Sequence, residues 1–207
     1  MKPISIAIDG PSGAGKSTIA RKTAEKFGFI YVDTGAIYRT VGLAAYRRGI
    51  ASKDSTAVIA MLPELHIELR HGPDGLQRMF LDGEDVSDAI RMPEISIYAS
   101  DVSAVPEVRA FLMEMLRSFA RTQNVIMDGR DIGTVVLPHA DVKIFLTADA
   151  EVRAKRRYDE LQQKGDKTPY AQILAETKQR DKQDSERAIA PLKPAPDAVK
   201  LDTSGNT

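Results

Sequence analysis

Short apolar runs alternate with longer segments of helical periodicity along most of this 207-residue chain. The first run, residues 4–8, is rich in β-branched side chains, as is typical of a buried strand in a parallel sheet. Apolar positions then recur at helical spacing through Phe27, and Gly28 can end that helix. The further strands that apolar runs predict are 29–32, 125–127, 142–146 and 199–201.

Between these strands the pattern predicts helices. They cover the segments 34–47 behind a cap at Asp33 or Thr34, 55–62 behind a cap at Asp54, 93–121 with a break near Pro106, about 149–163, and the stretch after Pro169. Strands that alternate with helices in this way indicate an α/β fold, in which helices sandwich a mostly parallel sheet. Ligands of such folds bind beyond the carboxyl ends of the strands.

Residues 64–87 depart from this alternation. His66–Arg70 alternates polar and apolar side chains, residues 72–75 have the composition of a turn, and residues 79–81 resume a strand. A two-stranded hairpin is marginally stable by itself, so we expect it to pack on the core as an insert.

The loop after the first strand, residues 10–18, reads GPSGAGKST and fits the phosphate-loop pattern G-x-x-x-x-G-K-[ST]. Its glycines let successive backbone N–H groups point inward at phosphates, and the following helix adds its dipole. We expect Lys16 to reach the β- and γ-phosphates of ATP, and Ser17 to offer its hydroxyl to Mg²⁺. The residues predicted to bind the triphosphate are Gly10, Pro11, Ser12, Gly13, Ala14, Gly15, Lys16, Ser17 and Thr18.

Composition excludes several classes of function. The 29 basic and 29 acidic residues cancel, which argues against a broad surface for nucleic acid or for an acidic membrane. The absence of cysteine excludes disulfides, thiolate catalysis and cysteine-based zinc sites, and the three histidines lack metal-binding spacing. Because there is no signal-peptide pattern and no apolar run near the ~20 residues that span a bilayer, we expect a cytoplasmic protein. Nothing in the sequence suggests a larger assembly, so we also expect a monomer.

A triphosphate-binding loop serves kinases, switch GTPases and motor ATPases alike. Three clusters that combine arginines with carboxylates, residues 33–39, 128–131 and 180–187, suit an anionic acceptor of a phosphate group. The first two clusters begin at strand ends, where Gly10 also lies. A switch GTPase needs a guanine-reading N-K-x-D run, which this sequence lacks, so the clusters favour a small-molecule kinase.

At these segments the chain resembles the bacterial cytidylate kinases, the (d)CMP kinases of the nucleoside monophosphate kinase group. The resembling segments are IDGPSGAGKST, FIYVDTGAIYR, EDVSDAIR, MDGRDIGTVVLPHADVKIFL and RDKQDSERAIAPLKPAPDA, spread over about residues 6–202. The last three are specific to the family, whereas the phosphate loop is generic. Members usually continue into a further helix, whereas this sequence stops at Thr207, so we expect a difference in C-terminal packing and none in chemistry.

The resemblance implies a P-loop NTPase-type α/β fold in a single kinase domain, residues 1–207, with three parts. A core of about 1–33, 122–150 and 169–207 is joined by a monophosphate-binding region of about 34–121, with the hairpin insert 64–87, and by a short helical lid of about 151–168. Closure of insert and lid is expected to exclude water from the reacting groups.

The resemblance also implies transfer of phosphate from Mg²⁺-ATP to CMP or dCMP. The residues that it implies for the acceptor are Thr34, Arg39, Ser100, Arg109, Arg130, Asp131, Arg180, Asp184 and Arg187. Arg39, Arg130 and Arg187 would hold the monophosphate, near Thr34, because guanidinium stays charged and grips phosphate oxygens bidentately. Asp184 would hold the ribose hydroxyls, with Arg180 beside it.

Ser100, Arg109 and Asp131 match the residues that read the base. Cytosine presents an N4 amine and N3/O2 acceptors, which suit a carboxylate or hydroxyl and an arginine. Uracil has O4 in place of the amine and would leave a carboxylate unpaired, so we expect UMP to be the poorer substrate. Asp128, at a strand end, is placed like the carboxylate that supports Mg²⁺ together with Ser17.

The lid stretch carries four cations, Arg153, Lys155, Arg156 and Arg157. Cations there could neutralise charge on the transferring phosphoryl group. The catalytic residues that the resemblance implies are Lys16, Arg130, Arg156 and Arg157. The alternative for the lid cations is a solvated helix face with an ordinary Glu151–Lys155 pair. Other small-molecule kinases, of UMP/CMP, adenylate or shikimate type, stay open as alternatives to a CMP kinase.

Overall fold

The computed structural model describes residues 2–205, so the chain end at Thr207 lies outside the described residues. The chain forms two compact units. The first comprises the described residues up to Ile30 together with those from Gln123 onward, and the second is Tyr31–Thr122. The predicted division into core, monophosphate-binding region and lid stays a prediction.

A five-stranded sheet is the centre of the fold, with the strand order β2-β6-β1-β7-β8. In chain order these strands are β1 (Ser5–Asp9), β2 (Ile30–Asp33), β6 (Val125–Gly129), β7 (Val142–Thr147) and β8 (Val199–Asp202). The pairings of β1 with β6, of β1 with β7 and of β7 with β8 are all parallel. The five predicted strands, the parallel sheet and its flanking helices are therefore confirmed.

Burial explains why the central strands read as unbroken apolar runs. In β6, all five residues are buried, and Ala7 and Ile8 of β1 are almost completely covered. A strand covered on both faces has no polar face to alternate with the apolar one. The edge strand β8 is exposed at every position, which is why its sequence mixes charged and apolar side chains.

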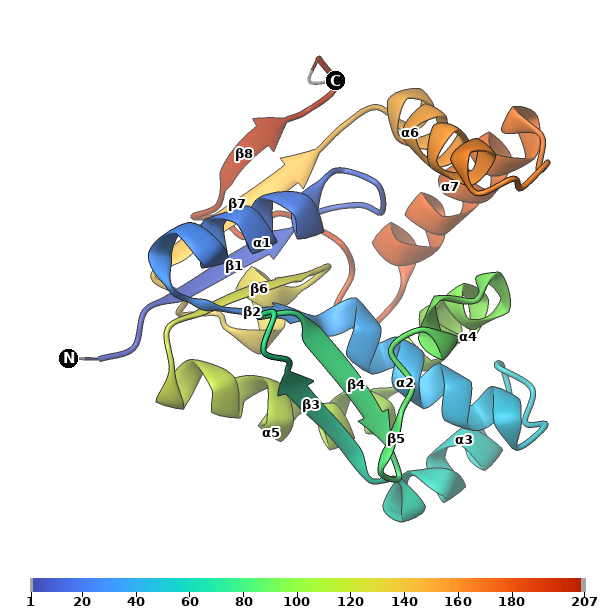
Figure 1. Ribbon diagram of the computed structural model, residues 1–207, viewed down its shortest axis with the longest axis horizontal. Coiled ribbons are helices and arrows are strands. Elements are labelled where there is room, and N and C mark those ends of the chain that lie inside the picture. The colour runs from blue at the N-terminus through green and yellow to red at the C-terminus, as the bar shows by residue number, and fades with distance from the viewer. Residues whose placement is uncertain (1, 206–207) are drawn as a thin grey trace. The chain divides into compact units, whose positions relative to one another are not determined.

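Three long helices belong to the first unit: α1 (Lys16–Phe27), α6 (Ala150–Gln163) and α7 (Tyr170–Glu186). Helix α1 begins after Gly15 and ends at Gly28, and both glycines adopt the left-handed conformation. Helices α6 and α7 lie side by side (Figure 1), where the rings of Tyr158 and Tyr170 meet edge to face with centroids 6.0 Å apart. None of the helices in residues 2–205 combines the length and apolar character that crossing a bilayer requires.

A short π-helical turn, η3 (Ile132–Val136), follows β6 and was not predicted. Its five residues are too few to show a helical period, and Val135 and Val136 both donate their N–H groups to the carbonyl of Asp131. The turn places Arg130 and Asp131 directly between the carboxyl end of a core strand and a helical segment.

The second unit combines helices with a small antiparallel sheet. Its elements are α2 (Thr34–Arg47), α3 (Ser55–Met61), η1 (Leu62–Glu64), β3 (Ile67–His71), β4 (Gln77–Leu81), β5 (Glu84–Asp85), η2 (Ala89–Arg91), α4 (Pro93–Ser103) and α5 (Pro106–Thr122). The predicted hairpin of β3 and β4 is confirmed, and the two-residue strand β5 extends it to three strands. Two residues are too short for alternation to be visible in the sequence.

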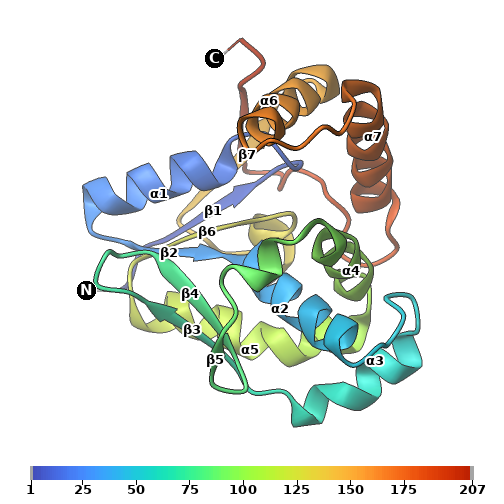
Figure 2. The same ribbon diagram turned by 45° about the vertical axis from the view of Figure 1, so that its right-hand side comes forward.

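Helices α2 and α4 pack closely within this unit (Figure 2). A β-carbon at Gly42 of α2 would lie 3.0 Å from the Cβ of Tyr98 and 3.1 Å from the backbone nitrogen of Ala99. The crossing therefore depends on glycine. At the start of α2, the Asp33 carboxylate accepts a hydrogen bond of 3.0 Å from the N–H of Ala36, which confirms Asp33 as the cap.

Candidate active site

The loop between β1 and α1 has a shape that requires glycine at three positions. Gly10, Gly13 and Gly15 have φ angles of +150°, +78° and +88°, which side chains rarely allow. A β-carbon at Gly10 would also lie only 1.9 Å from the carbonyl oxygen of Leu146 in β7. The loop is therefore curled tightly against the sheet at the head of α1, as a phosphate-binding loop requires.

Lys16 and Ser17 open helix α1, and both side chains are held. The buried ammonium of Lys16 donates to the carbonyl of Pro11 at 2.8 Å, so the lysine folds over its own loop. The hydroxyl of Ser17 donates to Oδ2 of Asp128, the fourth residue of β6, at 2.9 Å. The structure thus brings together the two residues predicted for Mg²⁺.

A hydroxyl next to a carboxylate suits a hard cation such as Mg²⁺, which prefers oxygen ligands. Within residues 2–205, no group of three or more acidic, histidine or cysteine side chains could hold a metal ion. Mg²⁺ in phosphate-transferring enzymes keeps several waters and binds substrate phosphates, so one or two protein oxygens suffice. Ser17 and Asp128 fit that pattern.

Asp9, the last residue of β1, is a buried carboxylate that the sequence analysis did not select. It accepts hydrogen bonds of 2.7 Å from the backbone N–H groups of Ile132 and Gly133. Burial raises the pKa of Asp9 to about 6, against the two backbone hydrogen bonds, which lower it. The one available signal was its place at a strand end, which it shares with Asp33 and Asp128.

Four of the residues predicted for the acceptor meet in two ion pairs of the first unit. Nε of Arg130 lies 2.7 Å from Oδ2 of Asp184, and Nη2 of Arg187 lies 3.4 Å from Oδ1 of Asp131. Asp131 and Asp184 are buried, and both arginines are largely covered. Arg180 lies on α7, about one turn before Asp184, and is half-buried.

The remaining acceptor residues belong to the second unit. Thr34 is buried at the first position of α2, and Arg39 is half-buried on the same helix. Ser100 lies on α4, also half-buried. Arg109 of α5 is buried, with its guanidinium 5.7 Å from the ring centroid of Tyr38.

The cations of α6 separate into two groups. Arg153 is buried and donates to the carbonyl of Ser12 at 3.1 Å, to that of Ala148 at 2.8 Å, and bidentately to Asp181 of α7. Arg156 donates to the carbonyl of Thr203 at 2.5 Å. These contacts tie α6 to the phosphate loop and to α7.

Lys155 and Arg157 lie on the outer side of the same helix. Lys155 pairs with Asp159, and Arg157 pairs with Glu160. The expected Glu151–Lys155 pair is not formed, because Glu151 binds Lys178 of α7 at 2.7 Å. The interpretation as a solvated face holds for Lys155 and Arg157, whereas Arg153 and Arg156 face inward.

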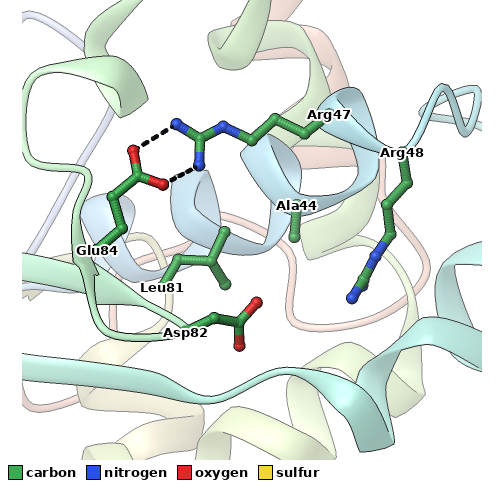
Figure 3. Close-up of a pocket in the computed structure, with 6 residues that line it drawn as sticks. All are labelled: Ala44, Arg47, Arg48, Leu81, Asp82 and Glu84. Carbon is green, nitrogen blue, oxygen red and sulfur yellow. Dashed lines mark hydrogen bonds and ion pairs between the residues drawn. The ribbon is translucent and has the colours of Figure 1, made fainter.

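A cavity of about 170 Å³ lies elsewhere, in the second unit (Figure 3). Its lining residues are Ala44, Arg47, Arg48, Leu81, Asp82 and Glu84. Arg47 forms a bidentate ion pair with Glu84 at 2.7 and 2.8 Å, which raises the pKa of Arg47 and lowers that of Glu84. None of the predicted site residues lines this cavity, so we do not assign substrate binding to it.

Phosphate-loop enzymes bind a nucleoside triphosphate with a lysine and a serine at the head of a helix, behind a glycine-rich loop. A buried aspartate of a neighbouring strand lies next to the serine, as it does here. Fold and site together define a kinase of the phosphate-loop class. The sequence model of the cytidylate kinase family matches residues 6–207, and the chain belongs to the cytidylate kinase family.

Individual relatives agree with the family. The cytidylate kinase of Caldicellulosiruptor bescii is 52% identical over 204 residues, which cover 99% of this chain and 90% of that protein. The cytidylate kinase of Desulfitobacterium hafniense is 50% identical over 204 residues, with 99% and 87% covered. The prediction of a cytidylate kinase, a phosphotransferase that acts on CMP, is therefore confirmed.

Solved structures are more distant. Shikimate kinase from Bacteroides thetaiotaomicron aligns with a TM-score of 0.43 at 14% identity, covering 89% of this chain and 81% of that chain. A likeness of this size supports no argument about the site.

Proposed function

We propose that this enzyme transfers the γ-phosphoryl group of Mg²⁺-ATP to CMP and dCMP, giving ADP and CDP or dCDP. An oxygen of the acceptor phosphate forms a bond to the γ-phosphorus, and the bond from that phosphorus to the bridging oxygen breaks, so that ADP leaves with the electron pair. The acceptor is already an anion at neutral pH, so no strong general base is needed. The observation that carries the proposal is the pairing of Arg130 with Asp184 and of Arg187 with Asp131.

On the donor side, residues 10–18 bind the triphosphate of ATP through their backbone N–H groups. Lys16 places its charge on the β- and γ-phosphates, where negative charge must be held during transfer. Ser17 and Asp128 would hold Mg²⁺, which when bound neutralises the charge of the phosphate oxygens. The hydrogen bond between Ser17 and Asp128 orients both oxygens in advance.

On the acceptor side, we assign the monophosphate to Arg39, Arg130 and Arg187, near Thr34. Asp184 holds the ribose hydroxyls with Arg180 beside it. The base is read by Ser100, Arg109 and Asp131. In all of these roles the residue types match the chemistry of CMP, since arginine suits phosphate and the O2 acceptor, and a carboxylate suits the N4 amine.

The ion pairs have a specific use in this proposal. A guanidinium carries five N–H donors in a rigid fork, and one carboxylate engages only some of them. Asp184 accepts a hydrogen bond from Nε of Arg130, and Asp131 accepts one from Nη2 of Arg187. In this proposal the two carboxylates fix the orientation of the arginines toward the phosphate of the acceptor.

We assign Arg156 and Arg157 of the lid helix to stabilising the transferring group, together with Lys16 and Arg130. The position of Arg156 supports this role better than the position of Arg157 does. Arg156 lies beside the phosphate loop, with Nη1 3.5 Å from the carbonyl of Gly13, whereas Arg157 is half exposed and paired with Glu160. The proposed place of action is the cytoplasm, where ATP and CMP are found, and the proposed state is a monomer.

The experiment that tests this proposal measures ADP release from Mg²⁺-ATP with one acceptor at a time: CMP, dCMP, UMP, AMP or shikimate. Fast turnover with CMP and dCMP, and slow turnover with UMP, is the expected result. Comparable rates with CMP and UMP would favour a broader pyrimidine kinase and would remove the base-reading role of Asp131. No acceptor-dependent ADP from a folded, ATP-binding sample would overturn the proposal.

A further inference from the structure

Asp9 joins the donor loop to the segment after β6, which carries the acceptor residues Arg130 and Asp131. It is the last residue of β1 and directly precedes Gly10, where the phosphate loop begins. Both of its carboxylate oxygens are used: Oδ1 accepts the N–H of Ile132, and Oδ2 accepts the N–H of Gly133, each at 2.7 Å. Distances this short are typical of hydrogen bonds to a charged acceptor.

The two N–H groups that Asp9 accepts are the first of the π-helical turn η3. The first N–H groups of a helical turn have no partner inside it, and the side chain of the preceding residue commonly accepts one of them. That preceding residue is Asp131, and aspartate is among the preferred caps, yet its side chain makes no capping hydrogen bond. The carboxylate of Asp9, 123 residues before Ile132 in the chain, takes this role instead.

The Asp131 carboxylate is consequently directed elsewhere. Its Oδ1 lies 3.4 Å from Nη2 of Arg187, on the acceptor side of the site. An aspartate that capped its own turn would have to swing its carboxylate back toward the N–H groups of Gly133 and Thr134. Because Asp9 already accepts the N–H of Gly133, Asp131 is not needed as the acceptor of that group.

We propose that Asp9 is a positioning residue, which caps η3 in place of Asp131 and so keeps the Asp131 carboxylate aimed at the base of the acceptor. This inference rests on the base-reading role proposed for Asp131. It adds that discrimination between cytosine and uracil depends on a residue that touches neither substrate and that belongs to the donor strand.

Two features of the surroundings favour this role. Lys16 lies close enough to Asp9 to stabilise its ionised form, although burial and the nearby Asp131 oppose ionisation and raise the pKa of Asp9 to about 6. The contact with Gly133 is also tight, since a β-carbon there would lie 3.3 Å from Oδ2 of Asp9 and 3.2 Å from Cδ of Lys143. The bare backbone at Gly133 therefore leaves the room that the Asp9 carboxylate occupies.

The test compares Asp9→Asn with the wild-type enzyme, with CMP and UMP as acceptors at saturating ATP. Asparagine keeps the size of the side chain but has one oxygen, and its amide N–H₂ group faces an N–H donor. We expect kcat/KM for CMP to fall about 10- to 100-fold, the value for UMP to fall much less, and the KM for ATP to change less than about threefold. The ratio of CMP to UMP efficiency therefore falls, which a merely structural loss would not cause.

Asp141→Asn is the matched control. Asp141 accepts the N–H of Ser5 at 2.8 Å and its hydroxyl at 3.1 Å, so it holds the other end of the same strand β1. It lies outside the donor and acceptor residues assigned above. We expect the ratio of CMP to UMP efficiency to stay at the wild-type value in this variant, even where its thermal stability falls.

Two further variants keep the test decisive. If Asp9→Asn does not fold, Gly133→Ala is used instead, because its added methyl group displaces the same carboxylate. The ratio of CMP to UMP efficiency is again expected to fall. An unchanged ratio overturns the inference. Asp131→Asn checks the role on which the inference rests. An unchanged ratio in Asp9→Asn together with a lowered ratio in Asp131→Asn overturns the positioning role alone, whereas an unchanged ratio in Asp131→Asn overturns the base-reading role and this inference with it.

Discussion

Charged side chains in the first unit occur in two regions that differ in burial. We call one the buried charge cluster; its members, at most 6% exposed, are Asp9, Lys16, Asp128, Asp131, Arg153 and Asp184. We call the other the exposed lid pairs, which are Lys155–Asp159, Arg157–Glu160 and Lys164–Glu160 on α6 and just beyond it. Both regions use the same residue types, so composition does not distinguish them.

The two regions differ in the free energy needed to remove each charge from water and in the segments that each charged side chain connects. Removing an ion from water costs several kcal/mol even in a real protein, and only close partners compensate. Asp9, Asp128, Asp184 and Arg153 each have such partners, on segments far apart in the sequence. The exposed lid pairs join residues three or four positions apart, where the gain is about 0.5 kcal/mol or less. Buried charge therefore marks the places where the chain requires fixed orientation.

The largest expected effect is that of Lys16→Ala. Removing the buried ammonium from the loop takes away the charge that we assign to the β- and γ-phosphates, so we expect kcat to fall by about 10³-fold or more. The measurement is steady-state ADP release with CMP, with thermal unfolding to verify the fold. Lys155→Ala is the matched control, since it deletes an exposed ammonium of the lid and is expected to change kcat less than about twofold. More than a tenth of wild-type kcat in Lys16→Ala would contradict the comparison.

The next effect concerns the pair of Arg130 and Asp184. In Asp184→Asn the guanidinium loses its ionised partner at a largely covered site, which commonly costs about 2–5 kcal/mol. We expect kcat/KM for CMP to fall by about 100-fold, mostly through KM, because Arg130 loses the partner that orients it and the ribose contact proposed for Asp184 is weakened. The KM for ATP should stay within about threefold of wild type. Asp159→Asn, which breaks an exposed lid pair, serves as the control, and an equal loss there would remove the distinction.

Local sequence patterns were sufficient for the long helices, the strands of the parallel sheet and the phosphate loop, but not for the short elements β5 and η3. The strands and helices follow from apolar runs and helical periods, and the curled loop follows from Gly10, Gly13 and Gly15. The buried charge cluster was found only in part. Lys16, Asp128, Asp131 and Asp184 were selected as site residues, and Arg153 only as one of four lid cations. Asp9 was not selected, although it stands in the segment IDGPSGAGKST. The roles assigned to these residues stay proposals until tested.

Asp9, which was missed, and Arg153, which was not distinguished from the neighbouring cations, have partners that no local pattern reveals. Asp9 caps a turn 123 residues away, and η3 itself is too short for a periodic signal. Arg153 stands in a run of four cations in five residues, and nothing in that run distinguishes it from Lys155. Its burial depends on Ser12 and Asp181, which lie 141 positions before it and 28 after it. Such assignments need tertiary structure.

The pH dependence of stability tests the cost of burying Asp9. Its folded-state pKa is raised from 3.8 to about 6, so the folded protein binds the proton more tightly than the unfolded chain. The stabilisation from the proton is complete below pH 3.8 and is lost as the pH rises through about 6. We therefore expect the unfolding free energy of the wild type, relative to Asp9→Asn, to fall by about 2 kcal/mol between about pH 4 and pH 6.5. Denaturant titrations at each pH measure this difference, and a constant difference would show that Asp9 is not buried as an ion.

The smallest expected effect is the coupling between Lys155 and Asp159. The two side chains are four positions apart on α6 and are 61% and 50% exposed, so water screens their attraction. A double-mutant cycle with Lys155→Ala and Asp159→Ala should give a coupling of at most about 0.5 kcal/mol in the unfolding free energy. In 1 M salt, where the Debye length is about 3 Å, the coupling should vanish.

A double-mutant cycle on Arg153 of α6 and Asp181 of α7 measures the coupling of a buried pair for comparison with the exposed pair. The Arg153 side chain is 5% exposed and its pair with Asp181 is bidentate, so bulk salt reaches it poorly. We expect its coupling to be several times larger than that of Lys155 and Asp159, and nearly unchanged in 1 M salt. Equal couplings for the two pairs, or equal loss in salt, would mean that burial does not separate the two regions and that the inward face of α6 is no more rigid than its outward face.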